Sequence, residues 1–287
     1  MIATIVSGGI GNQLFMYAAA RALSLRQNTD LVLNIEKGFR DDYTYKRNFE
    51  LNVFKLKYHQ DAILTFDTFL GKIIYKVSRI FGRNILRPSY KLLHDTTDNK
   101  GVDERFFKCD DSDYFLDGYW QSEMYFKDYE NVIRDDLVFS FDKSGVLQNE
   151  EYQIFSQSGK IPVCMGVRRY QECTGPLSFS ITDEEYYIKA MDYMCAQLHD
   201  PVFYVFTQDK DWVLSKLNID GKYDIRFVVD KENATIEDLY LMSRFKYHII
   251  SNSSFYWWGA WLANGDIVIS NSNFVNKKSN CSLWTII

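Results

Sequence analysis

The sequence has little of several things that define whole classes of protein. Its 287 residues include only 4 prolines and 15 glycines, which excludes collagen-like and low-complexity chains. No segment approaches the roughly 20 consecutive apolar residues that a membrane-spanning helix needs. The first residues also lack the basic and apolar regions of a secretory signal. We therefore expect a cytoplasmic protein.

Cysteine and histidine are also too few, and too scattered, to form a metal site. The 5 cysteines contain no C-x-x-C pair, and the 4 histidines show no ligand spacing. This pattern predicts free thiols in a reducing compartment and no bound metal. The net charge of −5 disfavours a dedicated nucleic-acid-binding protein.

Aromatic residues, in contrast, are abundant, at 16% of the chain. Hydrophobic residues make up 46%, and a chain of this length buries about three quarters of its unfolded surface. The aromatic excess has two interpretations, a large core or surfaces that stack on sugars or bases.

Strand-like and helix-like segments alternate along the chain. A strand at Ile2–Val6, a glycine-rich turn, a helix and a strand at Leu31–Ile35 predict the first unit of an open α/β sheet. Similar alternation between 161 and 269 predicts a second Rossmann-like domain. The polar stretch Gln148–Lys160 suggests a boundary, so we expect domains at 1–157 and 158–287. The segments predicted in the second domain are strands Ile161–Val167, Pro201–Phe206, Phe227–Val229, His248–Ile250 and Ile267–Ile269, and helices Glu184–Leu198, Asp209–Leu217, Ile236–Arg244 and Ser254–Ala263.

The glycine-rich turn reads Gly8-Gly9-Ile10-Gly11-Asn12-Gln13. Glycines between a strand and a helix let the backbone approach a ligand, and the helix start favours negative charge. A dinucleotide-binding G-x-G-x-x-G would need glycine where this chain has Leu14, which disfavours a nicotinamide cofactor. Asn12 and Gln13 are polar side chains that suit a sugar.

An arginine pair follows the predicted strand Ile161–Val167. Ligands of open α/β sheets bind beyond the carboxyl ends of the strands. Arg168 and Arg169 are therefore placed to neutralise a diphosphate, although they also fit a surface pair without a ligand. Glu172 follows closely and suits either a catalytic base or an arginine partner.

Two further strand ends carry polar residues. Asp209 fits a carboxylate that binds ribose or guanine, or simply a helix cap. Ser253 and Ser254 fit a cap or a phosphate site at a helix start. A cap alone does not account for the aromatic run Phe255–Trp258 that follows.

A basic stripe lies between the two alternating regions. Its positive side chains recur three or four residues apart, which places them on one face of a predicted helix. The stripe fits an ordinary solvated face or a surface that contacts anionic lipid. Its members are Lys72, Lys76, Arg79, Arg83 and Arg87.

Taken together, these segments resemble family 11 glycosyltransferases, the bacterial α-1,2-fucosyltransferases. The matching pieces keep their order from residue 8 to residue 260. They are Gly8–Phe15, Gly118–Glu123, Val167–Arg169, Phe206–Asp209 and Ser251–Ala260.

The resemblance implies two Rossmann-like domains facing a cleft, the GT-B type. It also implies a GDP-β-L-fucose donor and inverting, metal-independent transfer without a cofactor. The acceptor would be O2 of a terminal β-galactose of a glycan. A lipid-linked glycan at the inner membrane is a separate hypothesis, which would give the basic stripe a purpose. Catalytic roles fall to Arg168, Glu172 and Asn12. The expected donor-binding residues are Gly9, Gly11, Asn12, Gln13, Arg168, Arg169, Asp209, Asn252, Ser253, Ser254 and Phe255.

Acceptor contacts are expected from aromatic residues, namely Tyr43 in the 38–47 loop, Tyr119, Trp120 and Trp257. Two other functions fit many of the same features. One is a different GDP-sugar transferase, with another linkage or acceptor. The other is a non-catalytic carbohydrate-binding protein, which would not need the arginine pair.

The chain departs from the family pattern beside that arginine pair. Relatives usually read His-x-Arg-Arg-Gly-Asp-Tyr, whereas Gly166 and Gln171 replace the His and the Asp here. The general base is therefore open. Glu172 lies one position later, and a shift of one residue points a side chain elsewhere.

Overall fold

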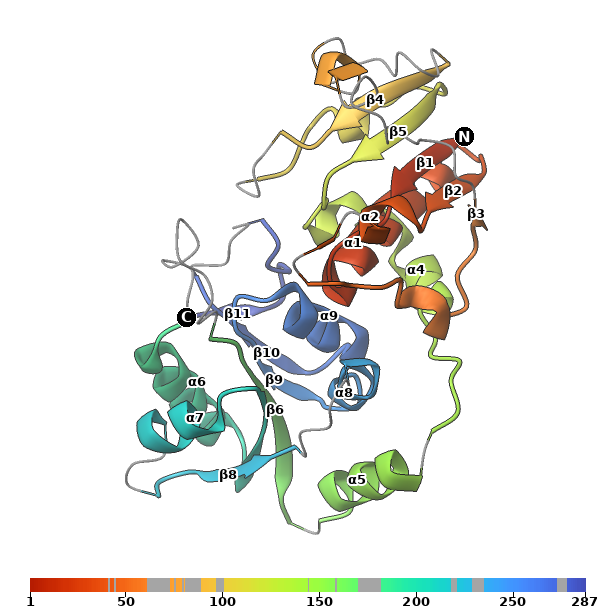
Figure 1. Cartoon of the computed structure of the whole chain (residues 1–287). Helices are drawn as coiled ribbons and strands as arrows, with labels where there is room; N and C mark the ends of the chain where they lie inside the picture. The colour runs from red at the N-terminus through yellow and green to blue at the C-terminus, as the bar shows by residue number, and fades with distance from the viewer. Residues whose placement is uncertain are drawn as a thin grey trace. The chain divides into compact units, whose positions relative to one another are not determined.

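The computed structural model describes two compact units, Met1–Ser140 and Phe141–Ile287 (Figure 1). Both combine parallel sheets with helices, so the predicted architecture of two Rossmann-like α/β domains is confirmed. The cleft expected between the two units stays a prediction. The described residues are 1–40, 42–43, 45–60, 73–74, 76–78, 80, 89–96, 101–143, 145–157, 159–169, 182–217, 221–228, 235–272 and 278–287.

In the first unit the described strands form a parallel sheet in the order β3-β2-β1-β5-β4. The central strands are continuous buried runs, as expected for a sheet covered on both faces. Strands β2 and β3 lie on one side of β1, and the later strands β5 and β4 lie on the other side. The strand order therefore reverses between β1 and β5. The strands are β1 (Ile2–Ile5), β2 (Leu31–Asn34), β3 (His59–Gln60), β4 (Tyr90–His94) and β5 (Asp113–Asp117).

Helix α1 (Ile10–Arg26) is the main helix of this unit, and most of its residues are buried. A buried carboxylate ties it to α4 (Glu130–Asp136), because Asp136 accepts hydrogen bonds of 2.9 Å from both Tyr17 Oη and Arg21 Nε. The other elements of this unit whose bounds lie within the described residues are short. They are α2 (Lys37–Arg40) and the 3₁₀ turns Leu51–Val53, Phe106–Lys108, Glu123–Tyr125 and Lys127–Tyr129.

In the second unit the described strands form a parallel sheet in the order β11-β10-β9-β6-β7-β8. The order reverses between β6 and β9. The strands are β6 (Ile161–Val167), β7 (Pro201–Thr207), β8 (Asp224–Phe227), β9 (Tyr247–Ile249), β10 (Ile267–Ser270) and β11 (Thr285–Ile286). The helices are α5 (Gly145–Phe155), α6 (Glu184–Gln197), α7 (Lys210–Lys216), α8 (Thr235–Met242) and α9 (Ser254–Ala263).

Helix α5 accounts for the difference between the expected and observed boundaries. We placed the boundary at 157/158 because the preceding stretch is polar, but the compact units divide after Ser140. Part of that stretch belongs to α5, which packs on the second unit. Phe155 contacts Phe245 with ring centroids 4.9 Å apart, and Glu151 pairs with Arg244 at 3.0 Å.

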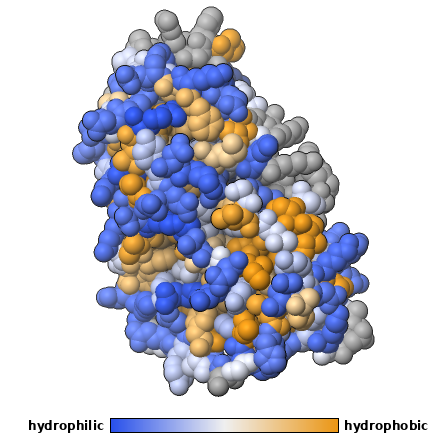
Figure 2. Space-filling view, turned by 180° about the vertical axis from the view of Figure 1, so that it is seen from behind, coloured by the Kyte–Doolittle hydropathy of each residue, from blue (hydrophilic) through white to orange (hydrophobic). Residues whose placement is uncertain are grey.

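The surface is mostly hydrophilic on the face shown in Figure 2, where apolar residues form separate patches. A search of the described residues finds no helix long and apolar enough to cross a membrane. Of the basic stripe, only Lys76 lies among the described residues.

Candidate functional site

The point where the strand order reverses in the second unit lies between β6 and β9. In open α/β sheets, ligands bind at such a point, beyond the carboxyl ends of the strands. The backbone joins the two strand ends directly, since Ser251 N–H donates to the Gly166 carbonyl at 3.2 Å. The segments Arg168–Arg169 and Ser251–Ser254 therefore meet at one edge of the sheet, although they are far apart in sequence.

Both arginines that follow β6 contact side chains from the segment that follows β7. Arg168 Nη1 donates to Gln208 Oε1 at 2.7 Å. The guanidinium of Arg169 lies over the ring of Trp212, 4.4 Å from its centroid, which is a cation–π contact. The Nε of Arg169 is buried and has no hydrogen-bond partner among the described residues. A buried donor of this kind is costly unless a ligand satisfies it.

Asp209 begins the helix that carries Trp212. Its Oδ1 accepts a 3.3 Å hydrogen bond from Trp212 N–H, and its own N–H donates to Thr207 Oγ1 at 2.9 Å. The cap interpretation of Asp209 is therefore correct, and a contact with guanosine stays a prediction. The cap also fixes the turn of helix that supports Arg169.

Helix α9 begins beside the end of β6, from which the two arginines follow. Ser253 is the N-cap residue in an extended conformation, yet its side chain makes no capping hydrogen bond. The preceding Asn252 is anchored through its backbone, because its N–H donates to Thr182 Oγ1 at 3.2 Å. Backbone N–H groups at such a start favour an anion. Ser254 and Phe255, the first two helical residues, are half-buried.

The tryptophans of α9 belong to the core. Trp257 is fully buried, and its Nε1 donates to the Ser279 carbonyl at 2.7 Å. Its ring lies against Trp258 and Trp284, with centroids 5.0 and 5.4 Å away. The prediction that Trp257 contacts the acceptor is corrected here, because no face of the ring reaches the surface.

The ring of Tyr256 packs directly against Gly166. A Cβ placed on Gly166 would lie 2.4 Å from ring carbons of Tyr256, closer than real contacts allow. Tyr256 is held there by a 2.8 Å hydrogen bond from its hydroxyl to the Phe206 carbonyl. The tyrosine ring therefore occupies the space that a side chain at position 166 would need.

In the first unit the glycine turn and the Gly118–Glu123 motif meet at the reversal between β1 and β5. Gly8 has φ of +75°, a conformation that favours glycine. Gln121 Nε2 donates to Asn12 Oδ1 at 2.8 Å, and the Tyr119 ring lies close to Gly8. Gly9 caps α1, and Gly11 is buried inside its first turn.

Gln13 is structural. It is fully buried, and its Nε2 donates to the carbonyls of Gly8 and Asn48 at 2.9 Å. Its Oε1 accepts from Glu50 N–H at 3.0 Å. The prediction that its side chain binds the donor is corrected, because these bonds instead hold the 48–50 segment against the glycine turn.

Replacing Gln13 with alanine should lower the free energy of unfolding by roughly 1–3 kcal/mol, since buried backbone groups lose their partners. Urea unfolding of the full chain measures this change. Exposed Gln208 in the second unit is a control, and its alanine variant should unfold at nearly the wild-type urea concentration. Wild-type stability of the Gln13 variant would contradict the structural role.

The aromatic acceptor candidates of the first unit differ in exposure. Trp120 is fully buried against Phe106 and Tyr125, with centroids 5.5 and 5.2 Å away, which corrects its predicted acceptor contact. Tyr119 is 38% exposed and Tyr43 is 82% exposed, so both stay candidates.

Sequence reasoning missed two charged residues beside the turn. The guanidinium of Arg47 lies 3.7 Å from where a Cβ on Gly9 would stand. Burial raises the pKa of Glu50, opposed by the charge of Arg47 and by a hydrogen bond from Ile10 N–H. Arg47 ends the loop already singled out for Tyr43, whereas Glu50 carried no local signal. Glu172, the predicted base, lies outside the described residues.

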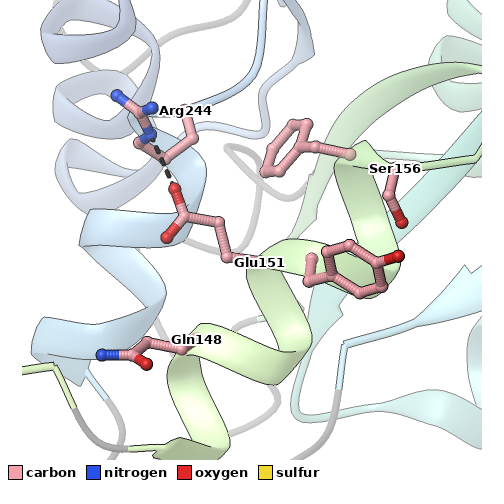
Figure 3. Close-up of a pocket in the computed structure, with 6 residues that line it drawn as sticks. Gln148, Glu151, Ser156 and Arg244 are labelled. Atoms are coloured by element: carbon pink, nitrogen blue, oxygen red, sulfur yellow. Dashed lines mark hydrogen bonds and ion pairs between the residues drawn. The ribbon is translucent and has the colours of Figure 1, made fainter.

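A shallow pocket of about 550 Å³ lies elsewhere in the second unit (Figure 3). Its walls come from α5 and from Arg244, which precedes β9, so it is not at the carboxyl edge of the sheet. Its polar centre is the Glu151–Arg244 ion pair, which is already satisfied. Among the described residues no group of three His, Cys, Asp or Glu side chains could hold a metal ion.

Comparison with known proteins identifies the chain's relatives. The family model of glycosyl transferase family 11 matches residues 1–282. An α-1,2-colitosyltransferase of Escherichia coli is 28% identical, over 92% of this chain and 88% of that protein. The O-antigen biosynthesis glycosyltransferase WbnK of Escherichia coli is 25% identical, over 97% of each chain.

A solved structure agrees on the fold. Arabidopsis thaliana FUT1, a variant in complex with GDP, superposes with a TM-score of 0.53 at 11% identity, over 92% of this chain and 68% of that one. The strand order, the arginine pair and the family match lead to one conclusion: this chain belongs to glycosyl transferase family 11.

Proposed function

We propose that this glycosyltransferase moves L-fucose from GDP-β-L-fucose to O2 of a terminal β-galactose of a glycan. One observation carries the proposal. Two adjacent guanidinium groups follow β6 at the β6/β9 reversal, beside the N-terminus of α9, where Ser253 makes no side-chain capping hydrogen bond. Fixed cations and backbone N–H groups at one point suit a diphosphate.

Donor roles follow from this geometry. Arg168 and Arg169 bind the diphosphate. The buried Nε of Arg169, which has no hydrogen-bond partner among the described residues, gives one of the bonds. Asn252, Ser253, Ser254 and Phe255 line the phosphates and the fucose. The carboxylate of Asp209, at the end of β7, binds guanosine.

In the first unit Gly9 lets a sugar approach the backbone, while Asn12, Tyr43 and Tyr119 offer polar and aromatic contacts. Aromatic rings suit the apolar faces of sugars. This unit would therefore bind the acceptor.

The reaction is a single in-line displacement with inversion. The acceptor oxygen attacks the anomeric carbon of fucose, and GDP leaves with the electron pair of the broken C–O bond. Negative charge grows on the diphosphate, where the two arginines stabilise it more strongly as it develops. In this proposal they supply the charge stabilisation, without a metal or a cofactor.

A second donor is favoured by the colitosyltransferase relative. Colitose is L-fucose without its 3-hydroxyl, so the two donors differ by one polar group. A site built to hydrogen-bond that hydroxyl rejects the deoxy sugar strongly. Competition between GDP-fucose and GDP-colitose for one acceptor separates the two activities.

Lipid linkage of the acceptor is part of the proposal, supported by an O-antigen relative. It places the reaction in the cytoplasm at the inner face of the plasma membrane. The basic stripe between 72 and 87 would then contact anionic lipid, and charge-reversed variants should bind anionic vesicles less well.

Ligand binding tests the proposal without any acceptor. GDP at 100 times its Kd should raise the free energy of unfolding by about 2.7 kcal/mol, because it binds only the folded chain. ADP, free L-fucose and free galactosides are the controls in a thermal-shift measurement. Stabilisation by galactosides with none by GDP would favour a non-catalytic carbohydrate-binding protein.

A further inference from the structure

We propose that Trp212 is a positioning residue of the diphosphate site: its ring holds the Arg169 guanidinium by one face and leaves the N–H groups at the guanidinium edge to the donor. The inference rests on the proposed function and concerns the second unit alone. The guanidinium carbon of Arg169 lies 4.4 Å from the centroid of the Trp212 ring. At this distance the negative face of the ring attracts the cation, and tryptophan gives the strongest attraction of the aromatic residues.

The sheet and a helix cap bring these two side chains together. Val167 pairs with Thr207 in the β6–β7 register, so the residues that follow the two strands leave the sheet side by side. Trp212 lies in the first turn of α7, and its N–H donates to Asp209 Oδ1 at 3.3 Å. The position of the indole is therefore set by the strand register and the cap.

The Trp212 ring is anchored in the core of the second unit. It is partly buried and packs against the main hydrophobic cluster, where its centroid lies 5.9 Å from that of Tyr187 in an edge contact. Tyr187 is fully buried, and its hydroxyl donates to the Gly166 carbonyl at 3.3 Å. A support continuous with the core reduces the freedom that the long Arg169 side chain would otherwise lose when it binds a ligand.

A contact through the ring face uses none of the five N–H donors of the guanidinium. The Nε of Arg169 is buried and has no hydrogen-bond partner among the described residues. A buried donor without a partner is costly, so this atom points to an oxygen supplied by a ligand. An aromatic support also leaves the positive charge undiminished, whereas a carboxylate support would neutralise it. Trp212 therefore orients the cation and keeps it available for an anion.

Arg226 in the same unit shows the opposite arrangement. Its Nε and Nη2 each donate to Asp224 at 3.1 Å, and its Nη1 donates to Gln157 at 2.7 Å. The ring of Tyr204 is 6.0 Å from its guanidinium carbon, a looser contact than the one at Arg169. Arg226 thus spends its donors within the fold, as a structural arginine does, whereas no described carboxylate pairs with Arg169.

The first test measures the Kd for GDP in the full chain by calorimetry. Trp212→Leu keeps apolar bulk but removes the ring, so it should raise Kd by roughly 2- to 30-fold, and Trp212→Phe should fall between it and the wild type. In an Arg169→Met background the change to leucine should leave Kd nearly unchanged, because Trp212 acts through the guanidinium. Tyr193→Leu removes another partly buried aromatic from the same cluster and should keep the wild-type Kd. Wild-type affinity in Trp212→Leu, or an equal loss in the Arg169→Met background, would overturn the inference.

The second test needs no nucleotide. In a proton–nitrogen NMR spectrum, the Nε–H signal of Arg169, identified by its loss in Arg169→Met, should exchange slowly with water and carry the ring-current shift of Trp212. Trp212→Leu should abolish that shift and speed the exchange, and an unchanged signal would overturn the inference. A wild-type chain that binds inorganic pyrophosphate but not GDP would overturn the proposed function and leave the role of Trp212 standing. Binding of neither ligand would overturn both.

Discussion

Replacing Arg168 with alanine should reduce fucose transfer by roughly 10²–10³-fold, the cost of losing one group that stabilises developing charge. The guanidinium stands at the carboxyl end of β6, where Gln208 accepts its hydrogen bond, beside the N-terminus of α9. Negative charge grows on the diphosphate as GDP leaves, so the loss should appear mainly in kcat. The fold should survive, because Arg168 is only half-buried.

Two companion variants sharpen that measurement. Arg168→Lys keeps the charge but loses the planar fork, so it should fall between wild type and alanine. Arg226→Ala removes an arginine of the same unit that pairs with Asp224, and it should leave kcat unchanged. Near-normal transfer by Arg168→Ala, with melting like the wild type, would remove Arg168 from the diphosphate site.

Replacing Gly166 with histidine, the residue that relatives usually carry, should destabilise this chain by about 1–3 kcal/mol or more. The new Cβ would overlap the Tyr256 ring, which is fixed by its bond to the Phe206 carbonyl. The ring must move, and its hydroxyl then loses a buried partner. Chemical unfolding of the variant measures the cost.

The double variant Gly166→His with Tyr256→Ala tests whether these two positions compensate. Removal of the ring makes room for the imidazole, so the double variant should be more stable than the sum of the single effects predicts. Tyr240→Ala replaces another buried tyrosine of the unit and should show simple additivity with Gly166→His. Additive costs at 166 and 256 would contradict the proposed steric exchange.

Much of the second unit could be predicted from sequence because its strands are apolar runs bounded by polar turns. The predicted strand Ile161–Val167 and helix Ser254–Ala263 match β6 and α9 residue for residue. The edge strand β8 was predicted at Phe227–Val229 and lies at Asp224–Phe227. The strand contains half-buried charged residues instead of a continuous apolar run, as an edge strand can. A search for apolar runs therefore missed its first residues.

The first unit was harder for a similar reason. Strands β4 and β5 end in His94 and Asp117, and β3 has only two exposed residues, so none stood out from the loops. His94 and Asp117 form a 2.6 Å hydrogen bond at these strand ends. The sequence alone does not show this contact, because it depends on the register of β4 against β5. Short strands of this kind owe their place to the sheet rather than to their own composition.

The sequence identified the aromatic motifs, but it did not show which of their rings are buried. Trp120 and Trp257 lie inside the motifs that carry the family resemblance, beside polar turns, which made both plausible sugar contacts. In the structure Trp120 adopts a positive φ of 55° and turns into the core, while Trp257 faces inward from α9. Exposure depends on the direction of a side chain from its element, which spacing alone fixes only within regular helices and strands.

The measurement that tests the central claim most directly is the structure of the product. The purified chain is incubated with GDP-β-L-fucose and a panel of glycans that end in β-galactose, and the new linkage is determined by NMR. We predict an α-linked fucose on O2 of galactose, with release of one GDP for each linkage formed. Fucose on another hydroxyl, a β linkage, or no transfer while GDP-colitose is consumed would contradict the assignment.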